Sequence, residues 1–118
     1  MLRKIECYIQ PFKLEPLTEA LVELGVDGMS VTEARGFGRQ RGHAVKGRAG
    51  AAQRKAGIKF LPKLKLEIVV REDMVDAAVA LVTKLARTGT VGAGKIFILP
   101  VEDAIRIGTG EAGHTAIA

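Results

Sequence analysis

The sequence predicts an α+β domain of the ferredoxin-like type, in which two βαβ halves give the element order βαββαβ. Three observations favour this fold class. Four segments carry apolar residues in the manner of strands, two carry them at helical spacing, and one connection is far longer than a hairpin loop. At 118 residues the chain can bury one core and not two, so residues 1–118 are predicted to form a single domain.

The first half of the chain predicts a strand, a helix and a second strand. Residues 5–9 alternate between apolar and polar side chains, which is typical of a half-buried strand. A stripe with helical i, i+3, i+4, i+7 spacing follows at Leu17, Ala20, Leu21 and Leu24. Pro16 suits the first helical position, and Gly25 suits the position just after the helix. The second strand is predicted over residues 29–35.

A third strand and a second helix come next. Residues 63–70 alternate again, with Pro62 at the start of the strand, where its missing N–H costs no ladder hydrogen bond. Apolar residues then recur at helical spacing over 75–86. Glu72 and Asp73 precede them and favour a helix N-terminus through capping and the helix dipole.

The end of the chain predicts a fourth strand over residues 95–99, with little alternation. Residues 101–107 are expected to form a short strand or a turn, and residues 110–118 a mobile tail. In this arrangement both helices cover one face of an antiparallel sheet. The other face is therefore expected to be solvated or covered by another subunit.

Composition favours a cytoplasmic protein with an aliphatic core. Aromatic residues make up only 4% of the chain and Trp is absent. The single cysteine, Cys7, cannot form an internal disulfide and is interpreted as a small core residue. The first residues lack the apolar stretch of a secretory signal, and no apolar run approaches the roughly 20 residues that span a bilayer.

The most unusual segment is residues 36–59, between the second and third strands. It holds seven of the 18 lysines and arginines and no acidic residue, so the positive charge of the chain is concentrated there. A loop of this length in a compact domain is either unstructured or functional. Its charge favours a partner-binding arm for an acidic surface, such as the cytoplasmic mouth of a transporter or an enzyme face. A membrane headgroup surface is a third alternative.

Two glycine-rich loops could hold an anion. Gly36 and Gly38 follow the second strand, and residues 88–94 lead into Lys95. Glycine lets backbone amides approach a phosphate closely, and a lysine or arginine adds charge. Each loop alone is equally well explained as a turn, and the second lacks Walker A spacing. Together with Arg106, the two loops favour a nucleotide site between neighbouring sheets.

Most of the chain resembles the PII signal-transduction protein family. The matching segments, in chain order, are residues 11–14, 28–33, 36–43, 60–70, 88–89, 92 with 94–97, and 106–107 with 109–111. The resemblance implies a homotrimer of ferredoxin-like subunits that bind adenine nucleotides in the clefts between them. It also implies that residues 36–59 correspond to the family's T-loop, and that the protein is a regulator and not an enzyme.

The resemblance assigns site residues one by one. Adenine and ribose would be held by Gly28, Met29, Ser30 and Val69. The phosphates would be held by Gly38, Arg39, Gln40, Gly92, Gly94, Lys95 and, from the neighbouring subunit, Arg106. Gly36, Phe37 and Ala93 are also counted as nucleotide-binding residues. Where 2-oxoglutarate binds in this family, Gln40 reaches the Mg²⁺ shared with ATP and Lys63 pairs with a carboxylate. ATP, ADP or AMP would bind as ligands, so no permanent cofactor is expected.

The chain departs from the family pattern at three places. The loop lacks the tyrosine that many members modify, since the only tyrosine is Tyr8 in the first strand. Ala93 replaces an aspartate between the cradle glycines, and Gly108 replaces a second phosphate arginine. Losing one guanidinium should weaken binding of the outermost phosphate by about 1–3 kcal/mol. The preference for ATP over ADP or AMP should therefore be weaker than in members that keep the arginine.

The competing interpretation is a basic-loop nucleic-acid-binding protein, because the isoelectric point is about 9.7. Phe37 is the only aromatic residue in the loop, however, so the loop offers no stacking platform for bases. We therefore expect a nucleotide-sensing regulator of a transporter or enzyme in nitrogen or inorganic-carbon metabolism. Its second effector would be 2-oxoglutarate or bicarbonate, its target is unknown, and nucleic acid is not the favoured partner.

Overall fold

The structure is a computed structural model of the chain and describes residues 1–38, 58–89 and 93–118. Its strands and helices, in chain order, are β1 (Leu2–Ile9), α1 (Leu14–Leu24), β2 (Ser30–Gly36), β3 (Leu61–Arg71), α3 (Val75–Ala86), β4 (Gly94–Val101) and α4 (His114–Ile117). Short 3₁₀ turns, η1 (Pro11–Lys13) and η2 (Glu72–Met74), lead into α1 and α3. The predicted order βαββαβ is confirmed.

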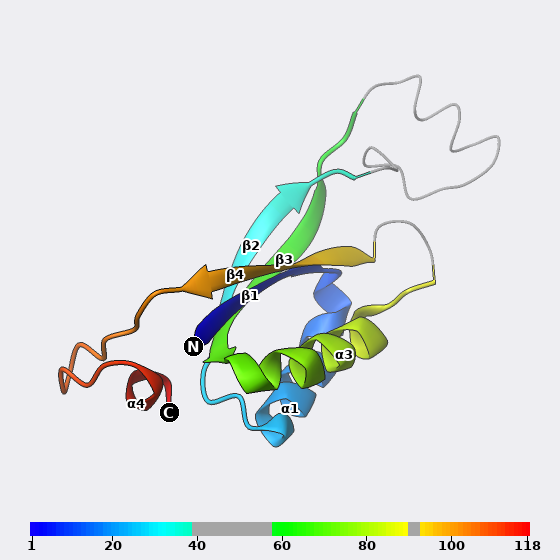
Figure 1. The fold of residues 1–118 in the computed structure, drawn as a ribbon. Helices are drawn as coiled ribbons and strands as arrows, with labels where there is room; N and C mark the ends of the chain where they lie inside the picture. The colour runs from blue at the N-terminus through cyan, green and yellow to red at the C-terminus, as the bar shows by residue number, and fades with distance from the viewer. Residues whose placement is uncertain (39–57, 90–92) are drawn as a thin grey trace.

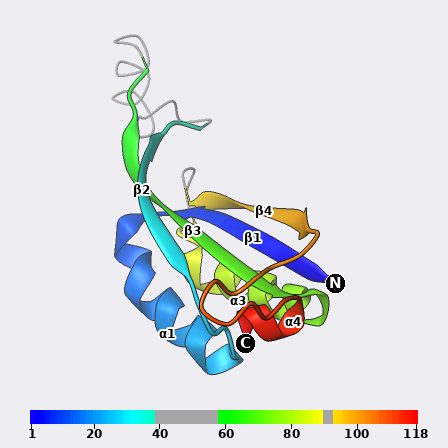
Figure 2. The same cartoon turned by 90° about the vertical axis from the view of Figure 1, so that its left-hand side faces the viewer.

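The strands form one antiparallel sheet in the order β2-β3-β1-β4. β1 lies inside the sheet, and its Lys4 faces Val69 on β3 and Leu99 on β4. Helices α1 and α3 lie on the same face of the sheet, and the other face is left open apart from the segment after β4 (Figures 1 and 2). This two-layer arrangement confirms the ferredoxin-like α+β fold, and the open face is where a further surface could pack.

The core lies between the sheet and the two long helices. Ile5, Cys7 and Ile9 of β1 point toward the helices and are at most 2% exposed. The buried cluster also contains Leu17, Leu21, Val26, Leu66, Ile68, Val70, Ala78, Val82 and Ala86. Aliphatic side chains therefore build the described core, as the scarcity of aromatic residues predicted. Burial raises the pKa of the Cys7 thiol to about 11, which keeps it protonated and suits the predicted packing role.

The starts of both long helices differ from the predictions. α1 begins at Leu14, so Pro16 is its third residue and not its first. This is tolerated because the first-turn N–H groups of a helix have no partner within the helix. No side chain caps α3, although Glu72 and Asp73 were expected to do so. The Asp73 carboxylate instead pairs with Arg71 at 2.5 Å.

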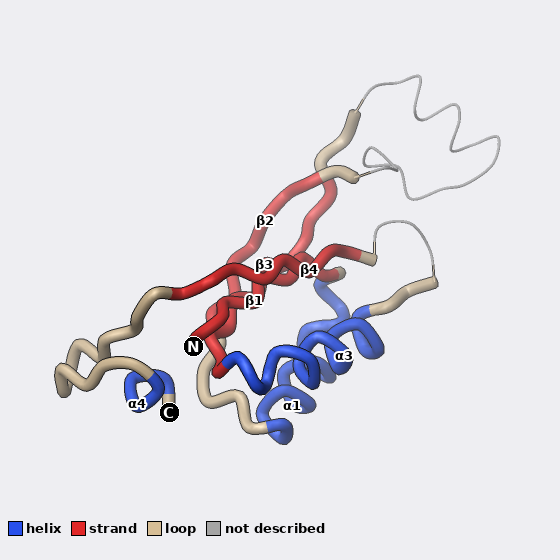
Figure 3. Tube along the Cα trace, in the orientation of Figure 1, coloured by secondary structure: helices blue, strands red, loops and turns tan. Residues whose placement is uncertain are grey.

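The last residues turn back on themselves instead of trailing away as a tail. Ile105 forms an isolated bridge with Ala112, so the turn expected over residues 101–107 is part of a larger hairpin-like excursion. The backbone N–H of Gly113 donates to the carbonyl of Ala104 at 2.9 Å and to the carboxylate of Asp103 at 3.0 Å. Figure 3 shows this excursion leaving the end of β4 and returning to α4. The mobile tail expected over residues 110–118 thus carries turns and a short helix.

β2 and β3 extend together beyond the rest of the sheet (Figure 1). Their pairing continues to Gly36 and Leu61, and the rings of Phe37 and Phe60 then meet edge to face, 5.2 Å apart. Most of the predicted basic arm, residues 39–57, lies outside the described residues. In the part of the chain that the structure describes, no helix is long and apolar enough to cross a membrane.

Candidate functional site

The residues predicted to hold adenine and ribose lie together. A hollow of about 390 Å³ is lined by Asp27, Gly28, Met29, Ser30, Glu67, Val69, Arg106 and the last three residues, 116–118. The turn before β2 brings residues 28–29 there, β2 begins with Ser30, and the neighbouring β3 brings Glu67 and Val69. The loop after β4 brings Arg106. The walls thus combine apolar surface, two carboxylates that can accept hydrogen bonds from a base or sugar, and one cation that can meet an anionic group.

Arg106 is bonded within its own chain. Its guanidinium donates to the carbonyl oxygen of Thr115 at 3.4 Å and to that of Ala118, and lies 3.5 Å from the carboxylate of Glu111. The resemblance implied that Arg106 reaches the site from the neighbouring subunit, whereas residues 28–30 belong to the subunit that holds the adenine. In the structure it lies beside residues 28–30 of the same chain, so any partner subunit would meet these residues as one group.

Glu67, which lines the hollow, belongs to a group of four alternating charges on the open face of the sheet. Lys4 contacts Glu67 and lies 3.0 Å from Glu6, while Lys65 lies 3.7 Å from Glu67 and 3.8 Å from Glu6. The hydrogen bond from Lys4 lowers the pKa of Glu67, and the bonds to Glu67 and Glu6 raise the pKa of Lys4. Glu67 is therefore an ionised hydrogen-bond acceptor at the edge of the hollow, suited to a ligand hydroxyl or amino group.

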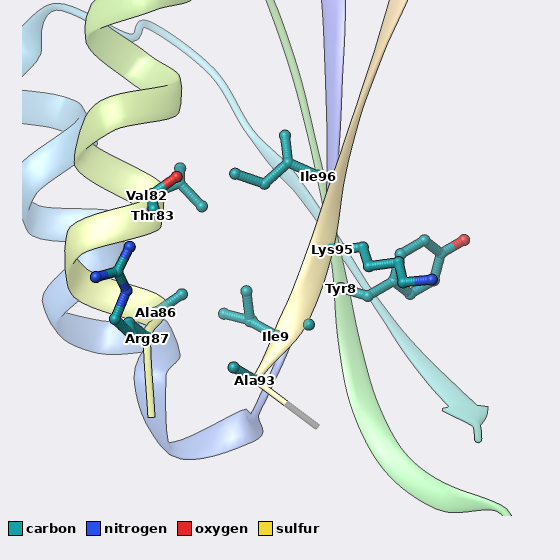
Figure 4. Close-up of a pocket in the computed structure, with 10 residues that line it drawn as sticks. Tyr8, Ile9, Val82, Thr83, Ala86, Arg87, Ala93, Lys95 and Ile96 are labelled. Carbon is teal, nitrogen blue, oxygen red and sulfur yellow. The ribbon is translucent and has the colours of Figure 1, made fainter. Parts of the chain in front are cut away.

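The second glycine loop lies elsewhere in the same chain. Ala93, Gly94 and Lys95 border a separate hollow of about 280 Å³ between the end of α3 and the start of β4. Its inner lining comes from side chains such as Ile9, Ile96, Val82 and Ala86. Figure 4 shows Lys95 and Tyr8 pointing away from this hollow, on the side of the sheet opposite α3. The lysine predicted to bind phosphate is thus presented on the open face.

Gly94 has a structural reason to be glycine. Its φ is +123°, a conformation that other residues rarely adopt, and a Cβ there would overlap the carbonyl oxygen of Tyr8. This close approach of β4 to β1 accounts for Gly94 without any ligand. Gly28, Gly36 and Gly108 differ, because a Cβ on any of them would meet nothing within 4 Å.

Of the other residues predicted to bind the nucleotide, three lie in the described part of the chain and three outside it. Gly36, Phe37 and Gly38 lie at the far end of β2, where Phe37 is 47% exposed. Arg39, Gln40 and Gly92 lie outside the described residues, so their predicted phosphate and Mg²⁺ contacts stay predictions. Within residues 1–38, 58–89 and 93–118, no group of three or more His, Cys, Asp or Glu side chains could hold a metal ion.

Lys63, the residue predicted to pair with a second effector, is almost buried at 9% exposure. Burial lowers the pKa of its ammonium group, because removal from water disfavours the charged form. A carboxylate brought to Lys63 would reverse that shift by favouring the ammonium ion. The pairing of Lys63 with an effector stays a prediction.

Sequence reasoning missed three parts of the first hollow. Glu67 precedes Val69 by two residues on the same strand face, so strand alternation alone could have placed it there. Asp27 comes directly before the predicted segment 28–30 and could have been included with it. Residues 116–118 carried no comparable signal, since a four-residue helix is too short to show periodicity.

Comparison with known proteins identifies relatives along nearly the whole chain. The family model for "Nitrogen regulatory protein P-II" matches residues 2–111. Nitrogen regulatory protein P-II of Cereibacter sphaeroides is 52% identical over 116 residues, and nitrogen regulatory protein P-II 1 of Escherichia coli is 47% identical. Each alignment covers 98% of this chain and 100% of the relative. The crystal structure of Arabidopsis thaliana PII bound to citrate matches with a TM-score of 0.77 and 35% identity, over 98% of this chain and 89% of that one.

Proposed function

The chain belongs to the nitrogen regulatory protein P-II family, and from that premise we propose that it senses adenine nucleotides in clefts between subunits. Members of this family are regulatory signal-transduction proteins, so the chain is a regulator and not an enzyme. The bound nucleotide would set the conformation of residues 36–59, and that arm would bind or release a target protein, such as a transporter. Such coupling requires nucleotides to differ in affinity for the conformations of the arm.

The observation that carries this proposal is the separation of the two predicted ligand-binding groups. Lys95 faces Tyr8 on one side of β1, whereas Val69 faces Lys4 on the other side. Tyr8 lies four residue steps along β1 from Lys4, which corresponds to about 13 Å along the strand. A single subunit therefore supplies two half-sites on its open face. A second copy would complete each site by placing its Lys95 half-site against this chain's adenine hollow.

The open face also provides a reason for assembly. Phe97 and Leu99 of β4 lie on it, exposed by 48% and 37% respectively, with Leu99 opposite Lys4 of β1. The ring of Tyr8 meets that of Phe97 edge to face at 6.2 Å. Apolar side chains on an otherwise charged sheet face gain stability when a neighbouring sheet covers them. We take the assembly to be a homotrimer, in keeping with the family resemblance.

The ligand chemistry follows from the residues present. Arg106 and Lys95 supply cations for phosphates, but Gly108 and Ala93 stand where the usual family pattern has an arginine and an aspartate. The site should therefore accept ADP or AMP at least as readily as ATP. The second effector should be a small carboxylate or bicarbonate at Lys63, with Mg²⁺ accompanying ATP at Gln40. The citrate-bound Arabidopsis relative supports carboxylate binding within the family.

Calorimetric titration with ATP, ADP and AMP tests the proposal. We expect each to bind, and Lys95→Ala to weaken binding by about ten- to a hundredfold, the value of one charge-assisted phosphate contact. Lys84→Ala is the matched control, because Lys84 is an exposed lysine of α3 on the opposite layer. Unchanged affinity in Lys95→Ala, or loss in both variants, would contradict a phosphate contact at Lys95.

The basic arm supports one alternative, a nucleic-acid-binding protein. Seven cations over residues 36–59 would contact phosphates, so affinity for DNA or RNA should fall steeply with added salt. Titrating a fluorescent oligonucleotide at two salt concentrations separates the alternatives. Salt-dependent oligonucleotide binding together with no stabilisation by nucleotides would favour the alternative over the nucleotide sensor.

A further inference from the structure

The C-terminal strap, residues 113–118, lies across a groove that contains the adenine hollow. A second hollow of about 370 Å³ borders the strap on its other side, toward Met74 and Val70. Both hollows share Asp27, Val69, Ile117 and Ala118 in their linings. The strap thus divides one groove along β3 into two parts. In Figure 2, α4 lies beside the end of β3, at the foot of the sheet.

The groups that hold the strap are the same groups that a nucleotide would use. The guanidinium of Arg106 donates to the backbone oxygens of Thr115 and Ala118, which are both on the strap. Its other side is paired with the carboxylate of Glu111, an internal anion. A phosphate seeking bidentate contact with Arg106 would have to replace these acceptors.

Resting on the proposed function, we infer that the C-terminal strap is an internal competitor of the nucleotide. It narrows the adenine hollow as part of its wall and takes up donors of Arg106, and the nucleotide displaces it on binding. The strap therefore sets the nucleotide affinity, since only the fraction of subunits with an open strap can bind.

The strap is suited to this role because it is held weakly. α4 has only four residues, too few for a helix that is stable by itself. Its apolar anchor is Ile117, which is half-buried and lines both hollows, whereas His114 and Thr115 are exposed. The rest of the strap is held by the half-buried Ala116 and by exposed hydrogen bonds, from Arg106 and between His114 and the N-terminal amine. A segment with so little buried apolar surface opens at low cost in free energy, so a ligand can displace it.

The first test weakens the anchor and measures ADP binding by calorimetry on the full-length protein. Ile117→Ser removes apolar contact but leaves Arg106 intact, so we expect ADP to bind about three- to tenfold more tightly. Val22→Ser is the control, because Val22 is an apolar residue on the exposed side of α1, 63% exposed. It should leave the ADP affinity unchanged.

The second test reports the position of the strap itself. Ala116→Cys places a thiol on the half-buried side of α4, within the hollow. The native Cys7 thiol is 2% exposed and burial raises its pKa to about 11, so it should contribute little background alkylation. We expect maleimide labelling at position 116 to accelerate with ADP, and to be fast without ligand when Ile117→Ser is also present.

The outcomes separate the inference from the function on which it rests. If ADP binds the wild type and Ile117→Ser equally, or if ADP slows labelling at position 116, the strap does not compete and the inference is overturned alone. The second result would mean that the strap closes over the nucleotide. If ADP binds neither the wild type nor Ile117→Ser, the proposed nucleotide site is wrong and the inference fails with it.

Discussion

Gly94 begins β4 directly against the carbonyl oxygen of Tyr8, and any side chain at position 94 would overlap that oxygen. This relationship gives the second glycine loop two separable properties. The glycine is required by the close approach of β4 to β1, while the neighbouring Lys95 is free to face the open side of the sheet (Figure 4).

Gly94→Ala should therefore destabilise the fold. The positive φ and the overlap with Tyr8 together should lower the free energy of unfolding by about 2–4 kcal/mol. Denaturant unfolding measured by circular dichroism checks this. Gly28→Ala is the control and should change stability by less than about 1 kcal/mol, since a Cβ there meets nothing within 4 Å. Equal stability of the two variants would show that β4 does not approach β1 so closely.

The fold could be predicted because its signals are local. Alternation in β1 and β3 and the stripes in α1 and α3 each arise from one buried face, and packing reinforces each of them. Helix starts were less predictable, as Pro16 shows. A proline is compatible with several positions in a first turn, so it does not fix where the helix begins.

The candidate site could be predicted only in part, because its parts come together over long distances in the chain. Alternation placed Val69 on a strand, but only the register shows that Ser30 lies opposite Glu67 beside it. The meeting of Arg106 with residues 28–30 depends on the path of the loop after β4, which no periodicity encodes. The docking of α4 depends on two half-buried residues, Ala116 and Ile117, and on hydrogen bonds from Arg106, which leave no periodic pattern in the sequence.

The charges around Glu67 predict an acid-sensitive structure. Because Lys4 lowers the pKa of Glu67 below its usual 4.5, the ionised form stabilises the fold above that value. The stabilisation is lost as the pH falls below 4.5 and Glu67 becomes protonated. Thermal melting between pH 3 and pH 7 should show a shallower acid decline for Glu67→Gln than for the wild type. Glu19→Gln, on the exposed side of α1, should retain the steep decline; a steep decline in Glu67→Gln too would count against the Lys4–Glu67 interaction.

The open sheet face predicts that the purified chain is a trimer at micromolar concentration, as light scattering can show. Phe97→Glu places a charge on that face among Tyr8 and Leu99, so it should shift the protein toward monomers. Phe12→Glu serves as the control, because Phe12 is also exposed but lies in η1, away from the sheet. A wild-type monomer would remove the intersubunit cleft, and a Phe97→Glu trimer would place the interface elsewhere.

Gly108 predicts which nucleotide the protein prefers. It follows Arg106 by two residues, it is exposed, and a Cβ there would meet nothing within 4 Å, so the chain can accept an arginine without strain. Gly108→Arg should restore a second guanidinium for the outermost phosphate and so strengthen ATP relative to AMP by about ten- to a hundredfold. Calorimetry with both nucleotides measures the ratio directly. Gly108→Gln is the matched control, because it adds a long polar side chain without the charge and should leave the ratio near that of the wild type.

If Gly108→Arg leaves the ratio unchanged, residue 108 does not face the phosphates. Another cation, such as Arg87 at the end of α3, would then have to hold the outermost phosphate. In that case Arg87→Ala should lower the affinity for ATP more than the affinity for AMP.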